Sequence, residues 1–141
     1  MTDGVVLDTH VWYWFVAGRT NRLARPVVRR IERAVSGAHA FVSAMSAWEL
    51  GMLVAKERLT LSMDVADWID ASREPSGIRV ADVTTEIAVD GARLLAFPTG
   101  DPADRIIVAT ARSMGAALIT CDERILDYGA TQVVKLVDGR R

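Results

Sequence analysis

The sequence predicts an α/β fold in which helices cover a mostly parallel central sheet. Short aliphatic and β-branched runs alternate with longer amphipathic segments, and no internal repeat or low-complexity linker interrupts the alternation. Strands that alternate with helices are typical of parallel sheets, because each parallel connection must cross back over the sheet. The 141 residues suit a single domain, residues 1–141, and half of them are hydrophobic, which is enough for one core.

The expected strands are short runs rich in Val, Ile and Leu, as in strands that are buried on both faces. They cover residues 5–8, 40–43, 78–83, 117–120 and 133–137.

Helices are expected where apolar residues recur every three or four positions. The clearest runs from Leu23 to Val35, where arginines at positions 25, 29, 30 and 33 predict a basic outer face. Ser46 and Asp101 are the expected N-caps of two others, and Pro102 suits a first helical position. The expected helices cover residues 10–17, 23–35, 46–54, 64–72, 85–95 and 101–114, with a helical turn over 123–128.

Composition limits the classes of function. The formal net charge is -1, so the chain is no general polycation, and an RNA site would need a local basic patch or a metal ion. The single cysteine, Cys121, excludes an intramolecular disulfide and a zinc site built from several thiolates. We expect a cytoplasmic protein, with no signal peptide and no apolar run long enough to span a membrane.

Four acidic side chains fall at the carboxyl ends of expected strands or in the first turn of the helices that follow. Asp8 ends the first strand and Asp122 follows the strand 117–120, whereas Glu49 and Asp104 lie in first helical turns. In open α/β sheets this edge is where ligands bind. Two carboxylates about 4 Å apart repel by roughly 4 kcal/mol at an effective dielectric constant near 20, so a cluster needs a compensating cation. Hard divalent ions such as Mg²⁺ and Mn²⁺ prefer oxygen ligands, activate water and stabilise charge on phosphorus.

Three of these acids also have a structural alternative. Ser46 and Glu49 match a capping box, and Asp104 and Asp122 could stabilise the starts of their own helices. Asp8 is the exception, because a carboxylate at the end of a buried strand has no routine capping role.

The motifs around these acids occur in the order and spacing of the PIN-domain nucleases, and the chain resembles the VapC toxins of bacterial toxin–antitoxin pairs. The likeness extends from Val5 to Val137. It rests on four segments: Val5-Val-Leu-Asp8-Thr-His-Val-Trp12, Val42-Ser-Ala-Met-Ser-Ala-Trp-Glu49-Leu50, Gly100-Asp-Pro-Ala-Asp104-Arg-Ile-Ile-Val-Ala-Thr-Ala111 and Leu118-Ile-Thr-Cys-Asp122.

This resemblance implies a three-layer α/β/α sandwich and an endoribonuclease that needs one or two Mg²⁺ or Mn²⁺ ions. It also implies a homodimer and an antitoxin partner that occupies the active-site groove. Carried over by position, Asp8, Asp104 and Asp122 would hold a metal ion, and Glu49 would bind a water molecule or a second ion. Asp101 is an alternative ligand to Asp104.

Several neighbouring residues are secondary candidates. The hydroxyls of Thr9 and Thr120 could orient carboxylates or metal-bound waters. Arg105 and Arg112, seven residues apart on one helix, could contact RNA phosphates or simply face solvent. Further candidates for phosphate contact are Arg25, Arg29, Arg30, Arg33, Lys56 and Arg58.

Other α/β classes fit less well. A dehalogenase-type phosphatase needs a second Asp two residues after the first, where this chain has His10. Nucleotide-binding folds need a glycine-rich loop after the first strand, and none is present. The non-enzymatic alternative is a catalytically silent PIN-like module that binds RNA or protein.

Overall fold

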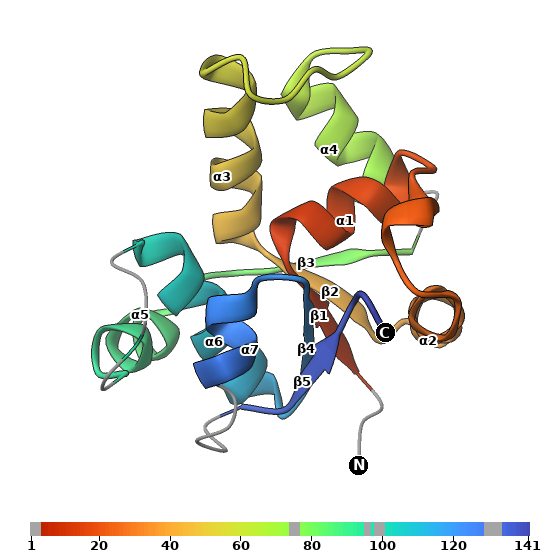
Figure 1. Ribbon diagram of the computed structural model, residues 1–141. Coiled ribbons are helices and arrows are strands. Elements are labelled where there is room, and N and C mark those ends of the chain that lie inside the picture. Colours follow the sequence, from red (N-terminus) through yellow and green to blue (C-terminus); the bar gives the residue numbers. More distant parts are fainter. Residues whose placement is uncertain (1–3, 74–76, 95–96, 98–100, 129–133) are drawn as a thin grey trace.

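The computed structural model describes residues 4–73, 77–94, 97, 101–128 and 134–141. Its centre is a five-stranded sheet in which every pair of neighbouring strands is parallel (Figure 1). The order of strands is β3-β2-β1-β4-β5. The strands are β1 (Val5–Leu7), β2 (Ala40–Ser43), β3 (Arg79–Ala81), β4 (Ala117–Thr120) and β5 (Leu136–Asp138).

Along the chain, helices separate successive strands, as the alternating sequence pattern predicts (Figure 1). They are α1 (Thr9–Val16), α2 (Arg25–Ser36), α3 (Ala44–Ala55), α4 (Val65–Arg73), α5 (Thr85–Ala92), α6 (Pro102–Met114) and α7 (Glu123–Tyr128), with a short 3-10 helix η1 (Thr20–Arg22) after α1.

Two hydrophobic clusters cover opposite faces of the sheet. Val5, Leu7 and Ile119 pack with apolar residues of α1, α2, α3 and α4. Val6 and Leu118, which alternate with them along the strands, pack with residues of α6 and α7. Because successive side chains of a strand point to opposite faces, both sides of the short strands are buried. The expected three-layer α/β/α arrangement is therefore confirmed.

The order of strands creates one switch point, between β1 and β4. The chain proceeds from β1 to β2 and β3 in one direction, and then returns to place β4 on the other side of β1. The connections that leave β1 and β4 therefore diverge, which opens a crevice at the carboxyl ends of these two strands. Asp8 follows β1 and Asp122 follows β4, so both acids lie at this crevice.

Some expected boundaries were wrong. Helix α3 begins at Ala44, because the Ser43 hydroxyl accepts the Met45 N–H at 3.0 Å and caps it; Ser46 is not the N-cap. The last strand, β5, covers residues 136–138 instead of 133–137, and residues 95 and 133 lie outside the described chain. Among the described helices, none has both the length and the apolar character needed to cross a bilayer.

Candidate active site

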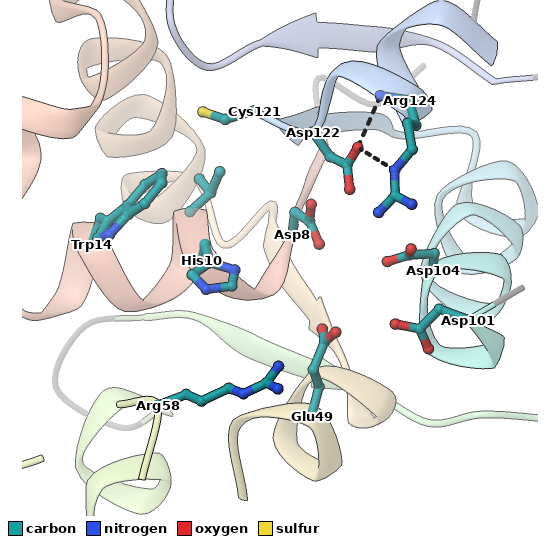
Figure 2. Close-up of a pocket in the computed structure, with 11 residues that line it drawn as sticks. Asp8, His10, Trp14, Glu49, Arg58, Asp101, Asp104, Cys121, Asp122 and Arg124 are labelled. Atoms are coloured by element: carbon teal, nitrogen blue, oxygen red, sulfur yellow. Dashed lines mark hydrogen bonds and ion pairs between the residues drawn. The ribbon is translucent and has the colours of Figure 1, made fainter. Parts of the chain in front are cut away.

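A pocket of about 580 Å³ opens at the carboxyl edge of the sheet, and acidic side chains dominate its lining. The four acids predicted from the sequence all line it, together with the alternative ligand Asp101 (Figure 2). They come from four elements or junctions: Asp8 after β1, Glu49 on α3, Asp101 and Asp104 at the start of α6, and Asp122 after β4. The structure thus brings together every acid that the sequence singled out.

Asp8 is held in place by two hydrogen bonds. Its Oδ1 accepts the Thr9 N–H at 2.9 Å, so the carboxylate caps α1, contrary to the expectation that it has no capping role. Its Oδ2 accepts the Thr120 hydroxyl at 2.6 Å. Burial raises the pKa of the Asp8 carboxyl, and the nearby charge of Asp122 raises it further, against the lowering effect of these hydrogen bonds.

Thr120 connects the two acids at the switch point. Its hydroxyl donates to Asp8 and also accepts the Asp122 N–H at 3.1 Å. The side chain is fully buried at the end of β4, so it cannot turn to solvent. Thr120 therefore fixes the position of Asp8 relative to the backbone of Asp122.

Glu49 lies in the second turn of α3 and is oriented by Thr9. The Thr9 hydroxyl lies within hydrogen-bonding distance of the Glu49 Oε1, to which it can donate, and of the Ser46 Oγ at 3.0 Å. Since Ser46 is buried against Thr9 and does not cap α3, the capping-box alternative for Glu49 is wrong. Burial raises the pKa of Glu49, and the charges of Asp8 and Asp101 add to this shift.

The two acids of α6 have different environments. Asp101 is exposed, and its Oδ1 accepts the Ala103 N–H at 2.9 Å, so it caps the helix as expected. Asp104 is only 7% exposed and faces the pocket from the first turn of α6 (Figure 2). One carboxylate oxygen from each of Glu49, Asp101 and Asp104 lies within 4.8 Å of the other two.

This set of donors fits a hard divalent cation. All the acidic ligand atoms are carboxylate oxygens, the type that Mg²⁺ and Mn²⁺ bind, and the spacing of Glu49, Asp101 and Asp104 allows these three to reach one ion. Burial raises the pKa of Asp8 and of Glu49, and repulsion from neighbouring carboxylates adds to both shifts. A bound cation would relieve this repulsion.

Arg105 and Arg112 have contacts that hold α5 and α6 together. Arg105 Nη1 donates to the carbonyls of Gly91 at 3.2 Å and Leu94 at 2.9 Å, and Arg112 Nε pairs with Asp90 at 3.1 Å. Neither arginine is among the described residues that line the pocket, and their contact with RNA stays a prediction.

Two other arginines do line the pocket, Arg58 and Arg124. Arg58 was only a minor candidate in the sequence, and Arg124 was not predicted. Its position two residues after Asp122, in the first turn of an expected helix, could have indicated it. The remaining lining comes from His10, Val11, Trp14 and Cys121.

Comparison with known proteins identifies the fold family. The family model described as PIN domain matches residues 5–130. The chain belongs to the PIN domain family. Over 124 residues this PIN domain is 37% identical to Ribonuclease VapC22 of Mycobacterium tuberculosis, a match that covers 88% of this chain and 91% of the relative. It is therefore a homologue of a VapC ribonuclease, as the sequence motifs predicted.

Solved structures share the same fold. One is DNA-bound VapBC from Salmonella typhimurium, with a TM-score of 0.65 and 16% identity, covering 97% of this chain and 98% of the other. Another is VapBC2 from Rickettsia felis bound to a promoter DNA fragment, with a TM-score of 0.66 and 14% identity, covering 95% and 97%. At these identities the likeness shows that the PIN fold is shared.

Proposed function

We propose that this PIN domain, residues 1–141, is a metal-dependent endoribonuclease that uses Mg²⁺ or Mn²⁺. The observation that carries the proposal is the gathering of Asp8, Glu49, Asp104 and Asp122 in one pocket at the switch point of the sheet. Homology to a VapC ribonuclease supports RNA as the substrate. The presence of all four acids favours catalysis over a silent module that only binds RNA or protein.

Each acid has a distinct task in this proposal. Asp8, Asp104 and Asp122 would hold one ion, and Glu49 would hold a water molecule or help to bind a second ion. The bound metal would supply activation of water and neutralisation of the charge that develops on phosphorus. Thr120 and Thr9 keep Asp8 and Glu49 in orientations that face the pocket, so the donors are already placed when the cation arrives.

The biological setting follows from the relatives. Solved neighbours include VapBC complexes and a toxin–antitoxin complex from Klebsiella pneumoniae, which supports a toxin that is controlled by a protein antitoxin. We also propose that the chain forms a homodimer and acts in the cytoplasm, where RNA and Mg²⁺ are both available.

Metal-dependent cleavage is the first expected result. The purified chain should cleave labelled RNA when Mn²⁺ or Mg²⁺ is present and should lose this activity in EDTA, because the acidic ligands cannot act alone. Gel analysis of end-labelled fragments measures the cleavage and separates internal from terminal cuts. RNA binding without cleavage under any metal condition would favour the silent module instead.

Removing the Thr9 hydroxyl should weaken catalysis without removing a ligand. Thr9→Val leaves Glu49 without its hydroxyl partner, so we expect a fall in cleavage rate of about 10- to 100-fold, typical for residues that orient metal ligands. Steady-state cleavage and a Mn²⁺ titration measure the effect. Thr9→Ser keeps the hydroxyl and serves as the control; if Thr9→Val cleaves as fast as Thr9→Ser, Thr9 does not orient Glu49.

A further inference from the structure

The acidic pocket presents an electrostatic problem for an RNA substrate. Five carboxylates line it, and even two divalent cations carry only four positive charges. RNA brings one negative charge with every phosphate, and proteins bind it largely by neutralising phosphates with Lys and Arg. The groups that bind the backbone next to the cleaved bond should therefore be cations at the wall of this pocket.

Three other arginines of the described chain already have partners. Arg105 donates to two backbone carbonyls, Arg112 pairs with Asp90, and Arg140 pairs with Asp138 at 2.9 Å and Glu123 at 3.0 Å. In contrast, the side chain of Arg58 has no hydrogen bond or ion pair with any residue that the structure describes. Arg58 nevertheless lines the pocket.

Arg58 reaches the pocket because of how α3 ends. The Arg58 N–H donates to the Leu53 carbonyl at 2.9 Å, and the Glu57 N–H donates to the Val54 carbonyl at 3.0 Å, which together form a Schellman motif. The motif places Glu57 at a φ of 55°, a left-handed conformation that is unfavourable for a residue other than glycine. This turn directs Arg58 back over the pocket, where its guanidinium points toward Glu49 (Figure 2).

Arg124 lies on the other side of the carboxylates (Figure 2). Its backbone N–H donates to the Asp122 Oδ1 at 2.9 Å, which fixes its position in the first turn of α7. Its side chain is 64% exposed, and its Nε is 3.7 Å from the same carboxylate oxygen. An exposed ion pair at this distance contributes little, so the guanidinium can exchange this contact for one with a substrate phosphate.

Resting on the proposed ribonuclease activity, we infer that Arg58 and Arg124 bind the RNA backbone, one on each side of the phosphate that is cleaved. The carboxylates between them would hold the metal, which would bind the reacting phosphate, and the two guanidinium groups hold the neighbouring phosphates. Guanidinium suits this role, because its fork of N–H donors matches the oxygens of a phosphate. The two arginines thereby set the path of the RNA across the carboxyl edge of the sheet.

The test measures RNA binding separately from cleavage. Arg58→Ala and Arg124→Ala are each placed in an Asp8→Asn background, and binding of a fluorescent RNA oligonucleotide is followed by anisotropy at several salt concentrations. Each variant should raise the Kd roughly tenfold. Each should also lower the slope of log K against log salt by about 0.7, the value for one phosphate contact on a single strand. Arg58→Lys should retain much of the slope, since the charge remains.

Arg79→Ala is the matched control. Arg79 is an exposed arginine at the first position of β3, the end of the strand opposite the carboxyl edge, so its removal changes the net charge equally without touching the pocket. Unchanged salt slopes in both pocket variants, or an equal loss in Arg79→Ala, would overturn the inference. A higher Mn²⁺ affinity in Arg124→Ala with unaltered RNA binding would do so too, because Arg124 would then be a counter-ion to Asp122 only.

The same variants with Asp8 intact separate this inference from the proposed function. KM for RNA should rise while kcat stays nearly constant, as expected when binding shared by ground and transition states is removed. If the parent protein cleaves no RNA but the salt slopes still fall in the arginine variants, the ribonuclease proposal fails and the RNA-binding role of the arginines stands. If the parent protein cleaves RNA but the arginine variants leave KM and the salt slopes unchanged, the ribonuclease proposal stands and the RNA-binding role of the arginines fails.

Discussion

Asp8→Asn should abolish RNA cleavage and, in the absence of metal, make the protein more stable at neutral pH. The amide oxygen can still accept from Thr9 or Thr120, and Asn is as good an N-cap as Asp, so the start of α1 is preserved. What the substitution removes is a buried negative charge beside other carboxylates. Cleavage should fall by at least roughly a thousandfold, because direct metal ligands contribute several kcal/mol to transition-state stabilisation.

The pH dependence follows from the direction of the Asp8 pKa shift. Burial raises the pKa of Asp8 in the folded state above its unfolded value. Its contribution to stability is therefore fully present below the unfolded pKa and is lost as the pH rises through the folded pKa. The melting temperature of metal-free wild type should fall relative to that of Asp8→Asn as the pH rises above the ordinary Asp pKa of 3.8. Thermal unfolding in EDTA measures both curves.

Added metal should reverse the order of stability. A cation that binds only the folded state stabilises it by about 2.7 kcal/mol at a hundred times its Kd, and Asp8→Asn should gain much less. Asp138→Asn is a control with the opposite pH dependence. Arg140 lowers the pKa of Asp138 to about 2, so the stabilisation by the Asp138 carboxylate is lost only as the pH falls toward this value. A metal-free Asp8→Asn protein that melts below wild type at neutral pH would show that the Asp8 charge is not destabilising.

Asp104→Asn should lower cleavage by roughly a hundredfold or more, whereas Asp101→Asn should lower it by no more than about tenfold. Both carboxylates line the pocket, but they have different structural roles. Asp101 is exposed and caps α6, a role that Asn can perform, while Asp104 is buried and points at the other acids. The prediction assigns the direct metal contact to Asp104.

Calorimetric Mn²⁺ titration separates these two acids without relying on cleavage. Asp104→Asn should lose most of the Mn²⁺ affinity, and Asp101→Asn should keep it. Asp101→Ala serves as the capping control and should cost about 1 kcal/mol of stability, because the Ala103 N–H loses its acceptor. A larger loss of Mn²⁺ affinity in Asp101→Asn than in Asp104→Asn would reverse the assignment of the ligand.

The capping residues show where sequence patterns were ambiguous. Asp101 was correctly predicted as the N-cap of α6, since Pro102 at the first helical position marks that start. For α3 the sequence pattern predicted Ser46 as the N-cap, whereas the Ser43 hydroxyl caps the helix and Ser46 contacts Thr9. Asp8 was wrongly excluded as a cap, because only one residue separates β1 from α1 and that residue, Asp8, is the N-cap of α1.

The sequence by itself determined the α/β class, the approximate strands and the placement of the four acids at the carboxyl ends of strands. These features depend on local periodicity and on the direction of parallel strands, both of which are encoded in short windows of sequence. Only the tertiary structure decided how the acids are oriented. Thr120 reaches Asp8 across 112 positions and Thr9 reaches Glu49 across 40, and the order of strands, not local pattern, brings them together. The same holds for Arg58 and Arg124, which line one pocket from opposite sides because β2, β1 and β4 are neighbours in the folded sheet.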